Sequence, residues 1–367
     1  IFASLAIPLG LDARWTAAAW AVEGAGIFWL GLRQQRLLAR GFGLLLQLGS
    51  ALAFLSELQA GEHTLLEGAP LGALLLGVAL LFSFWQLRKA GDEQVSAWER
   101  HGLPVLAGLG LGCLYLLAPL LLSINGTAIS WALAGAVTLF AGLRIASRTF
   151  LCAGLAVQVL GGTLLLWWAP WIDEEWPAFR HLGFWAPMLV GLAAFVGAWR
   201  LRGAGQSSVF DGLKLPRIAD GLLAWGVIWW AAALNSEVLR FTPPELQATF
   251  LLAAAAASVA LWTVLAVRLR WASLGAMSLL LMPAAAMVLL VSAHRYYHPA
   301  AEFGWLAWSC VFAVHFISLR LLSLVAPAKA LSIAHVLGCW MLIGMLALEL
   351  RYGLLVLSVQ YNAWRWL

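Results

Sequence analysis

The sequence is poor in charge and has no cysteine pattern, and each absence excludes a class of protein. Only 11% of its 367 residues are charged and 63% are hydrophobic, which leaves too little polar surface to coat a water-soluble globule. The four cysteines form no CxxC pair: Cys113, Cys152, Cys310 and Cys339. They predict small apolar packing residues, without a disulfide framework or a zinc site. The sequence therefore predicts an all-α integral membrane protein without a cofactor.

Long hydrophobic runs are abundant, and six of them end in Leu-Arg or a near equivalent. The endings are Leu32-Arg33, Leu87-Arg88, Leu143-Arg144, Leu201-Arg202, Val267-Arg268 and Leu319-Arg320. Successive arginines lie 55, 56, 58, 66 and 52 residues apart. Two membrane helices with short connections occupy about 50 to 60 residues, because each crossing needs about 20. The spacing predicts tandem helical hairpins of about 55 residues.

Thirteen membrane crossings are expected, in a single polytopic domain over residues 1–367. They are Ile1–Leu11, Trp15–Leu32, Leu37–Ser56, Pro70–Leu87, Leu103–Leu122, Thr127–Leu143, Thr149–Trp168, Gly183–Arg200, Asp220–Asn235, Pro244–Val267, Trp271–Ala293, Phe303–Leu319 and Leu331–Leu348. The first crossing starts inside an apolar run, so the chain is expected to be a fragment of a longer one. The tail Tyr352–Leu367 is predicted to be an interfacial helix.

The basic residues predict the orientation of the helices. Of the 22 Lys and Arg, 16 fall in connections on the side of the Leu-Arg endings. By the positive-inside rule these ends are cytoplasmic. The net charge of +5 is thus a signal of membrane topology, and no nucleic-acid partner is predicted.

A longer repeat underlies the hairpin period. Residues 16–55 match residues 127–166 at 13 of 40 positions without a gap, so the two copies are offset by 111 in residue number. The matches include Gly24 with Gly135, and Gln47 with Gln158. A shift of two hairpins preserves the direction of the helices, so a parallel internal repeat is predicted. The paired glycines and glutamines indicate helix packing.

Glu23 is the polar residue that the repeat does not explain, since the second copy has Ala134 in its place. It falls near the middle of a crossing, where a charge costs at least about 2.5 kcal/mol. Either a protonated Glu23 is hydrogen-bonded to Gln47, or it belongs to a proton- or substrate-coupled site with His315. His315 alone would be either a helix-contact residue or a titrating group.

The side opposite the Leu-Arg ends carries a cluster of aromatic and acidic residues. Tryptophan rings stack on sugars and cations while carboxylates accept their hydroxyl groups, so an outer-face substrate site is one interpretation. Its candidate residues are Asp12, Arg14, Trp171, Asp173, Glu174, Glu175 and Trp176. The alternative is an aromatic belt beside an acidic loop. His294 and His298 have the spacing of metal ligands on a helix, but Pro299 follows them, and an interfacial turn is the simpler interpretation.

The run from Ala6 to Gly24, followed by Trp29 to Arg33, resembles the core signature of a bacterial membrane protein family of unknown function, DUF2339. The resemblance implies a multi-pass protein of the bacterial inner membrane. It brings no catalytic residues, and it includes Asp12, Arg14 and Glu23.

Two functions remain open from the sequence. The first is binding or moving a lipid-linked or glycan substrate of the cell envelope. The second is a non-catalytic membrane scaffold within an envelope assembly, with other envelope membrane proteins and membrane lipids as partners. An ion-coupled transporter is a third alternative, and an enzyme is neither indicated nor excluded.

Overall fold

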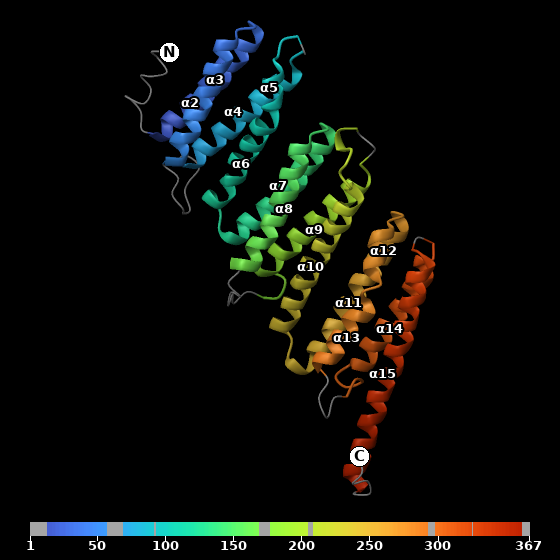
Figure 1. Cartoon of the computed structure of the whole chain (residues 1–367). Coiled ribbons are helices and arrows are strands. Elements are labelled where there is room, and N and C mark those ends of the chain that lie inside the picture. Colours follow the sequence, from blue (N-terminus) through green and yellow to red (C-terminus); the bar gives the residue numbers. More distant parts are fainter. Residues whose placement is uncertain are drawn as a thin grey trace. The chain divides into compact units, whose positions relative to one another are not determined.

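A computed structural model describes residues 13–56, 69–91, 93–168, 177–204, 208–292, 298–324 and 326–361, and the regular structure within these ranges is helical (Figure 1). The helices are α2 (Ala13–Arg33), α3 (Leu37–Ser56), α4 (Ala69–Lys89), α5 (Ala97–His101), α6 (Leu103–Leu121), α7 (Ile124–Arg144), α8 (Arg148–Trp168), α9 (Leu182–Arg202), the short 3-10 helix η1 (Ser208–Phe210), α10 (Leu215–Phe241), α11 (Pro244–Arg268), α12 (Ala272–Ser278), α13 (Leu281–Ser292), α14 (Gly304–Leu322) and α15 (Ala328–Tyr361).

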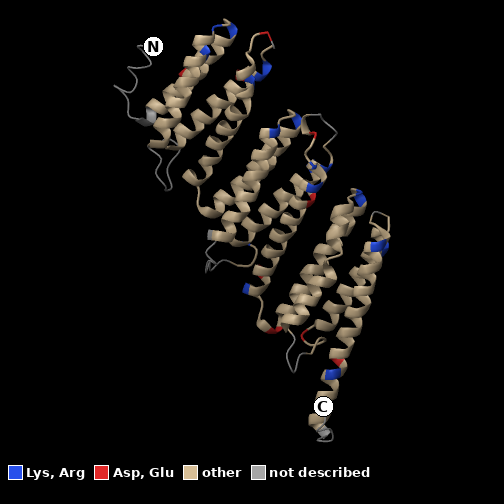
Figure 2. Cartoon of the chain, viewed as in Figure 1, with Lys and Arg blue, Asp and Glu red and all other residues tan. Residues whose placement is uncertain are grey.

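Eleven helical segments within the described ranges are long and apolar enough to cross a membrane. Many large apolar side chains on them are exposed, such as Leu52, Val137 and Leu290. A water-soluble protein would bury such side chains, whereas lipid tails solvate them. Figure 2 shows charged residues concentrated at helix ends, with the helix bodies almost free of them. The chain is therefore a multi-pass helical membrane protein.

The described residues contain eleven of these segments, whereas the sequence predicts thirteen crossings. The first predicted crossing, Ile1–Leu11, lies outside the described residues. The second forms α2, but this helix is not among the eleven apolar segments. It carries Glu23 together with tryptophans and glycines where the other helices have long aliphatic side chains.

Two helices are longer than predicted. α10 begins at Leu215, five residues before the expected start, because Pro216 fits the first helical turn, where its missing N–H is not needed. α15 runs without a break from Ala328 to Tyr361. The tail Tyr352–Leu367, predicted to be a separate interfacial helix, is therefore not separate as far as Tyr361: these residues continue the last helix.

Three hairpins share one turn after the arginine of the Leu-Arg ending. Gln35, Ala146 and Arg270 have φ of 54°, 47° and 49°. In each turn the following residue donates its N–H five residues back, from Arg36 to Gly31 at 3.0 Å, Ser147 to Gly142 at 2.9 Å and Trp271 to Ala266 at 2.7 Å. This is the Schellman helix ending, which satisfies a carbonyl that the helix leaves open. It explains why the helices stop where they do without glycine or proline.

Ala146→Gly is expected to stabilise the protein, because the left-handed conformation costs an L-residue about 1 kcal/mol that glycine avoids. Ala141→Gly, in the right-handed body of α7, is the control and should destabilise by about 1 kcal/mol. Unfolding in mixed detergent–SDS micelles measures both. A loss of stability in Ala146→Gly would contradict this account of the turn.

The two helices of a hairpin touch through glycines. A Cβ added to Gly43 would lie 2.7 Å from the carbonyl oxygen of Gly24. A Cβ on Gly154 would likewise lie 2.7 Å from the carbonyl oxygen of Gly135. α2 and α3 therefore approach backbone to backbone, as do α7 and α8. Helices in lipid gain stability from such close packing, because no hydrophobic effect drives them together.

Gly43→Ala should force α2 and α3 apart and destabilise the chain by about 1 to 3 kcal/mol, the cost of overpacking. Gly41→Ala is the matched control in the same helix, since nothing lies within 4 Å of its added Cβ. It should be neutral or stabilising. Equal losses in the two variants, measured by SDS-induced unfolding, would show that the close approach is unimportant.

The third hairpin contains a break between α12 and α13. Pro283 explains its position, because a proline clashes with the carbonyl four residues earlier, here that of Leu279. The two short helices together make one crossing, Ala272–Ser292.

The chain divides into two compact units. Unit 1 contains residues 1–173 and 192–219, and unit 2 contains residues 174–191 and 220–367. In unit 1, α2, α4 and α6 pack around Phe28, Leu76, Phe84 and Ala107, all buried. In unit 2, Trp308, Leu281 and Leu322 are among the most buried side chains. The single domain over residues 1–367 stays a prediction.

Candidate functional site

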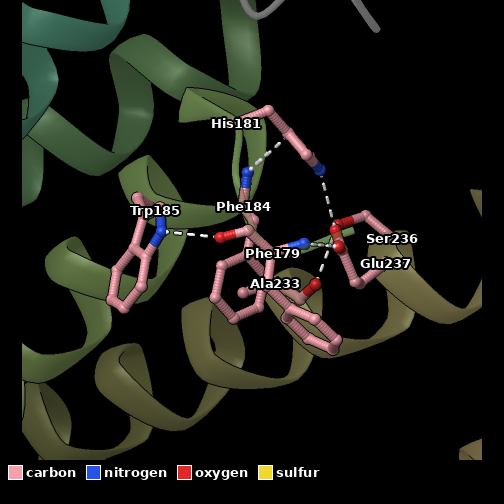
Figure 3. A network of polar contacts seen from close by, with 7 residues as sticks. All are labelled: Phe179, His181, Phe184, Trp185, Ala233, Ser236 and Glu237. Carbon is pink, nitrogen blue, oxygen red and sulfur yellow. Dashed lines mark hydrogen bonds and ion pairs between the residues drawn. The ribbon is translucent and has the colours of Figure 1, made fainter. Parts of the chain in front are cut away.

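A buried histidine and a buried glutamate meet in unit 2, at the helix ends opposite the Leu-Arg ends. His181 lies directly before α9, and Glu237 lies in the last two turns of α10. His181 Nε2 is 3.0 Å from Glu237 Oε2, and each side chain is 4% exposed. The backbone N–H of Phe179 donates to the other carboxylate oxygen (Figure 3). The carboxylate thus has a donor on each oxygen.

The hydrogen bonds define where the proton of His181 resides. The N–H of Phe184 donates to Nδ1 at 3.2 Å, so Nδ1 has no proton and Nε2–H is the donor to Glu237. Phe184 is the third residue of α9, and the ring therefore also caps this helix. Only the neutral Nε2–H form serves both the helix and the carboxylate. Because both ring nitrogens are occupied, His181 is an anchor and lacks a free nitrogen for general-base chemistry.

Aromatic side chains enclose the pair. Trp185 donates its indole N–H to the carbonyl of Phe179 at 2.9 Å, and the rings of Phe179 and Phe184 meet edge to face, 5.0 Å apart (Figure 3). Phe241, one turn after Glu237, lies 5.6 Å from the imidazole. These contacts exclude water from the hydrogen-bonded pair and hold the segment before α9 against α10.

A second histidine–glutamate pair in unit 2 has the same construction. His298, which precedes α14, places Nε2 2.7 Å from Glu349 Oε1 in α15. The backbone N–H of Ala300 donates to Glu349 Oε2 at 3.3 Å, and Tyr352 stacks on the imidazole at 4.1 Å. Here the side chains are 31% and 33% exposed. Each pair thus fastens the segment before one helix to the next helix, in one case buried and in the other half-exposed.

Glu23 and Gln47 are both in unit 1 but are not joined. Glu23 lies ten residues from either end of α2 and is half-buried. Gln47 Nε2 instead donates to Ser83 Oγ at 2.8 Å and to the carbonyl of Ala79 at 3.5 Å, both in α4. The predicted Glu23–Gln47 bond is wrong, because the amide of Gln47 faces α4. In the second hairpin, Gln158 similarly donates to the carbonyl of Ala193 in α9 at 3.1 Å.

His315 lies in unit 2 and is almost fully buried. Its Nε2 donates to the carbonyl of Ala334 in α15 at 3.0 Å. A Cβ on Gly338 would lie 2.6 Å from this nitrogen, so the imidazole packs against α15 only because that position is glycine. The ring contacts another helix, and the structure does not bring it together with Glu23 in one unit.

Most of the predicted outer-face residues lie outside the described residues. These are Asp12, Trp171, Asp173, Glu174, Glu175 and Trp176, together with His294 of the weak metal candidate. Arg14 belongs to the first turn of α2. His298 is bonded to Glu349 and, among the described residues, no group of three His, Cys, Asp or Glu could hold a metal ion.

Comparison with known protein families agrees with the membrane architecture. The family model "Predicted membrane protein (DUF2339)" matches residues 1–98 and residues 51–367. The chain belongs to the DUF2339 family. No curated protein and no solved structure matches it. The family description names a membrane protein and gives no activity.

The sequence predictions for this DUF2339 chain did not include His181, Glu237 or Glu349. A signal for them was present, because His181 and His298 both precede a helix that ends in Leu-Arg, and Glu237 and Glu349 both lie in the helix that follows. The pairing itself requires the fold, since 56 and 51 residues separate the partners.

Glu237→Ala should destabilise the chain by about 3 kcal/mol, because it leaves the buried His181 and the N–H of Phe179 without their acceptor. Glu349→Ala is the matched control at the half-exposed pair. It should lower the free energy of unfolding by less than about 1 kcal/mol. SDS-induced unfolding in detergent measures both. The assignment of Glu237 as the stronger anchor fails if the two variants lose equal stability.

Proposed function

We propose that the chain binds a lipid-linked or glycan substrate of the cell envelope at the helix ends opposite the Leu-Arg ends. The observation that carries this proposal is the anchored segment directly after the aromatic and acidic cluster. The segment begins at Pro177, directly after the last residue of the cluster, which consists of Trp171, Asp173, Glu174, Glu175 and Trp176. Two residues further on, the backbone of Phe179 is bonded to Glu237. A binding segment joined to rigid helices loses less entropy when it takes up a ligand.

The proposed ligand follows from the chemistry of the cluster. Tryptophan faces stack on sugar rings, and carboxylates accept hydrogen bonds from sugar hydroxyl groups. Neighbouring lipid would solvate the hydrophobic anchor of such a ligand. Asp12 and Arg14 are proposed to lie at the same membrane face, because Arg14 is in the first turn of α2, at the end away from Arg33, and Asp12 directly precedes this helix in the sequence.

We propose the inner membrane of a bacterium as the location, with the Leu-Arg ends in the cytoplasm. The distribution of Lys and Arg supports this orientation. The side chains of Arg33, Lys89 and Arg144 lie over aromatic rings of their own helices, at 5.0, 4.9 and 5.9 Å from the ring centroids. Such basic and aromatic pairs are typical of the membrane–water interface.

We further infer that the chain arose by duplication of a four-helix unit. The shift in residue number that aligns the two copies of the sequence carries both bounds of α2 onto those of α7, and the start of α3 onto that of α8. The family model matches residues 51–98 twice, as a repeated sequence would. The shared Schellman turn at Gln35, Ala146 and Arg270 suggests a third copy beginning at α11.

The substrate proposal predicts that the full chain, purified in detergent, binds a polyprenyl-pyrophosphate-linked oligosaccharide more tightly than it binds phosphatidylglycerol. Trp171→Ala with Trp176→Ala should weaken this binding at least tenfold, since stacking contributes about 1 to 2 kcal/mol per ring. Native mass spectrometry with titrated ligand measures the affinity.

Trp98→Ala is the control for this experiment, because Trp98 is exposed on α5 at the Leu-Arg side of the helices. Its affinity for the oligosaccharide should match that of the unaltered chain. Absence of any preference for the lipid-linked oligosaccharide over phosphatidylglycerol would refute the proposal.

A non-catalytic membrane scaffold is the second candidate, and one observation favours it. Buried polar side chains in the crossings join helices: Gln47 bonds α4, Gln158 bonds α9, and Thr263 bonds Ser318 in α14 at 2.9 Å. Side chains used in this way stiffen a bundle and do not line a path. The scaffold is favoured over substrate binding if the oligosaccharide experiment gives no preference.

Glu23→Gln separates both candidates from ion-coupled transport. Substitution removes the titratable proton but keeps the size of the side chain, so oligosaccharide affinity and unfolding free energy should change little at pH 6 and pH 8. An ion-coupled mechanism predicts instead that the unaltered chain binds with pH-dependent affinity and that Glu23→Gln abolishes this dependence.

A further inference from the structure

Two arginines from different helices lie over a single phenylalanine ring in unit 1. The Cζ of Arg200, in α9, is 4.9 Å from the centroid of Phe140, and the Cζ of Arg144, in α7, is 5.9 Å from it. Arg200 also lies 4.8 Å from the ring of Trp199. Both arginines and both aromatic side chains are exposed, at the Leu-Arg ends of their helices.

The charge of these two groups is not balanced within the described part of the chain. Other basic residues of unit 1 bond to protein oxygens: Arg40 pairs with Glu99 at 3.2 Å, and Arg148 donates to the carbonyl of Asp211 at 2.8 Å. Neither Arg144 nor Arg200 has a carboxylate within ion-pair distance among the described residues. Two like charges held over one ring favour an anion from outside the protein.

An exposed apolar surface continues from the arginines toward the centre of the membrane. Val137 and Leu133 lie one and two turns from Phe140 on the same face of α7. Val196 and Leu192 have the same relation to Arg200 on α9, and all four side chains are exposed. An acyl chain can lie along this surface while its phosphate meets the guanidinium groups.

Helices α2 to α6 provide an internal comparison. At the offset of 111 in residue number, Arg33 matches Arg144, Trp29 matches Phe140 and Lys89 matches Arg200. Here Arg33 lies over Trp29 and Lys89 over Trp85, at 5.0 and 4.9 Å, so the two cations have separate rings. Helices α2 to α6 therefore have matching basic residues at the Leu-Arg ends but lack the second guanidinium over a shared ring.

We propose that Arg144 and Arg200 bind the phosphate of an anionic phospholipid, with its acyl chains against Val137 and Val196. The planar guanidinium groups can each donate two parallel hydrogen bonds to phosphate oxygens. A lipid with net negative charge is favoured over a zwitterionic one, because neither guanidinium charge is balanced by a described carboxylate in ion-pair contact, and a choline group would add a further positive charge.

The test uses the full chain in detergent, titrated with phosphatidylglycerol or phosphatidylcholine and followed by native mass spectrometry. Each arginine near an anionic headgroup contributes about fivefold to affinity, so Arg144→Gln with Arg200→Gln should weaken phosphatidylglycerol binding about 25-fold. Binding of phosphatidylcholine should change little. The charge-preserving pair Arg144→Lys with Arg200→Lys should bind phosphatidylglycerol more tightly than the glutamine pair but less tightly than the unaltered chain, because lysine keeps the charge and loses the paired hydrogen bonds. This partial recovery distinguishes loss of the site from misfolding.

The matched control is Arg33→Gln with Lys89→Gln, which removes two charges at the Leu-Arg ends of α2 and α4. It should weaken binding much less than the Arg144 and Arg200 pair. Equal losses in the two double variants would overturn the proposal in favour of general surface charge. Competition by inorganic phosphate at concentrations equal to those of the lipid would overturn it in favour of a free-phosphate site.

Discussion

Close contact between α2 and α3, and likewise between α7 and α8, is the constraint on which the rest of the structure depends. Gly24 faces Gly43, and Gly135 faces Gly154, so that backbone carbonyls meet Cα atoms with no room for a side chain. At this distance the polar side chain of the second helix reaches past its partner to a third helix, as Gln47 reaches Ser83 and Gln158 reaches Ala193. One glycine contact therefore determines both the hairpin and its attachment to the following helix.

The two ends of the helices are built from different chemistry. At the Leu-Arg ends, arginines either bond to loop carbonyls or lie over aromatic rings at the surface, as Arg148 and Arg200 do. At the opposite ends, His181 with Glu237 and His298 with Glu349 fasten loops to helices. A cation-rich end suits a leaflet of anionic headgroups, and rigid loops at the other end suit recognition of a ligand. The proposed activities belong to these ends, because the described polar groups within the crossings mostly join helices.

Several features were predictable from sequence because they repeat. The glycine pairs and the two glutamines recur at equivalent positions of the two matching sequence stretches, and their packing role follows from the recurrence. The partner of Gln47 was not predictable: depth in the membrane can be counted along the chain, but rotation of a helix toward α4 and away from Glu23 depends on tertiary packing. His181 and Glu237 were missed for a related reason, since neither lies near the other in the chain. The extent of α15 was missed because its apolar pattern is interrupted at Glu349, Arg351 and Tyr352, which the helix nevertheless includes.

Hydrogen exchange of the segment from Pro177 to Pro187 tests the central claim that the aromatic and acidic cluster is followed by a rigid anchor. The amides of Phe179 and Phe184 donate to Glu237 and His181. They should exchange slowly in the unaltered chain and rapidly in Glu237→Ala, while exchange at residues 298–303 is unchanged. Rapid exchange of both amides in the unaltered chain would contradict the account.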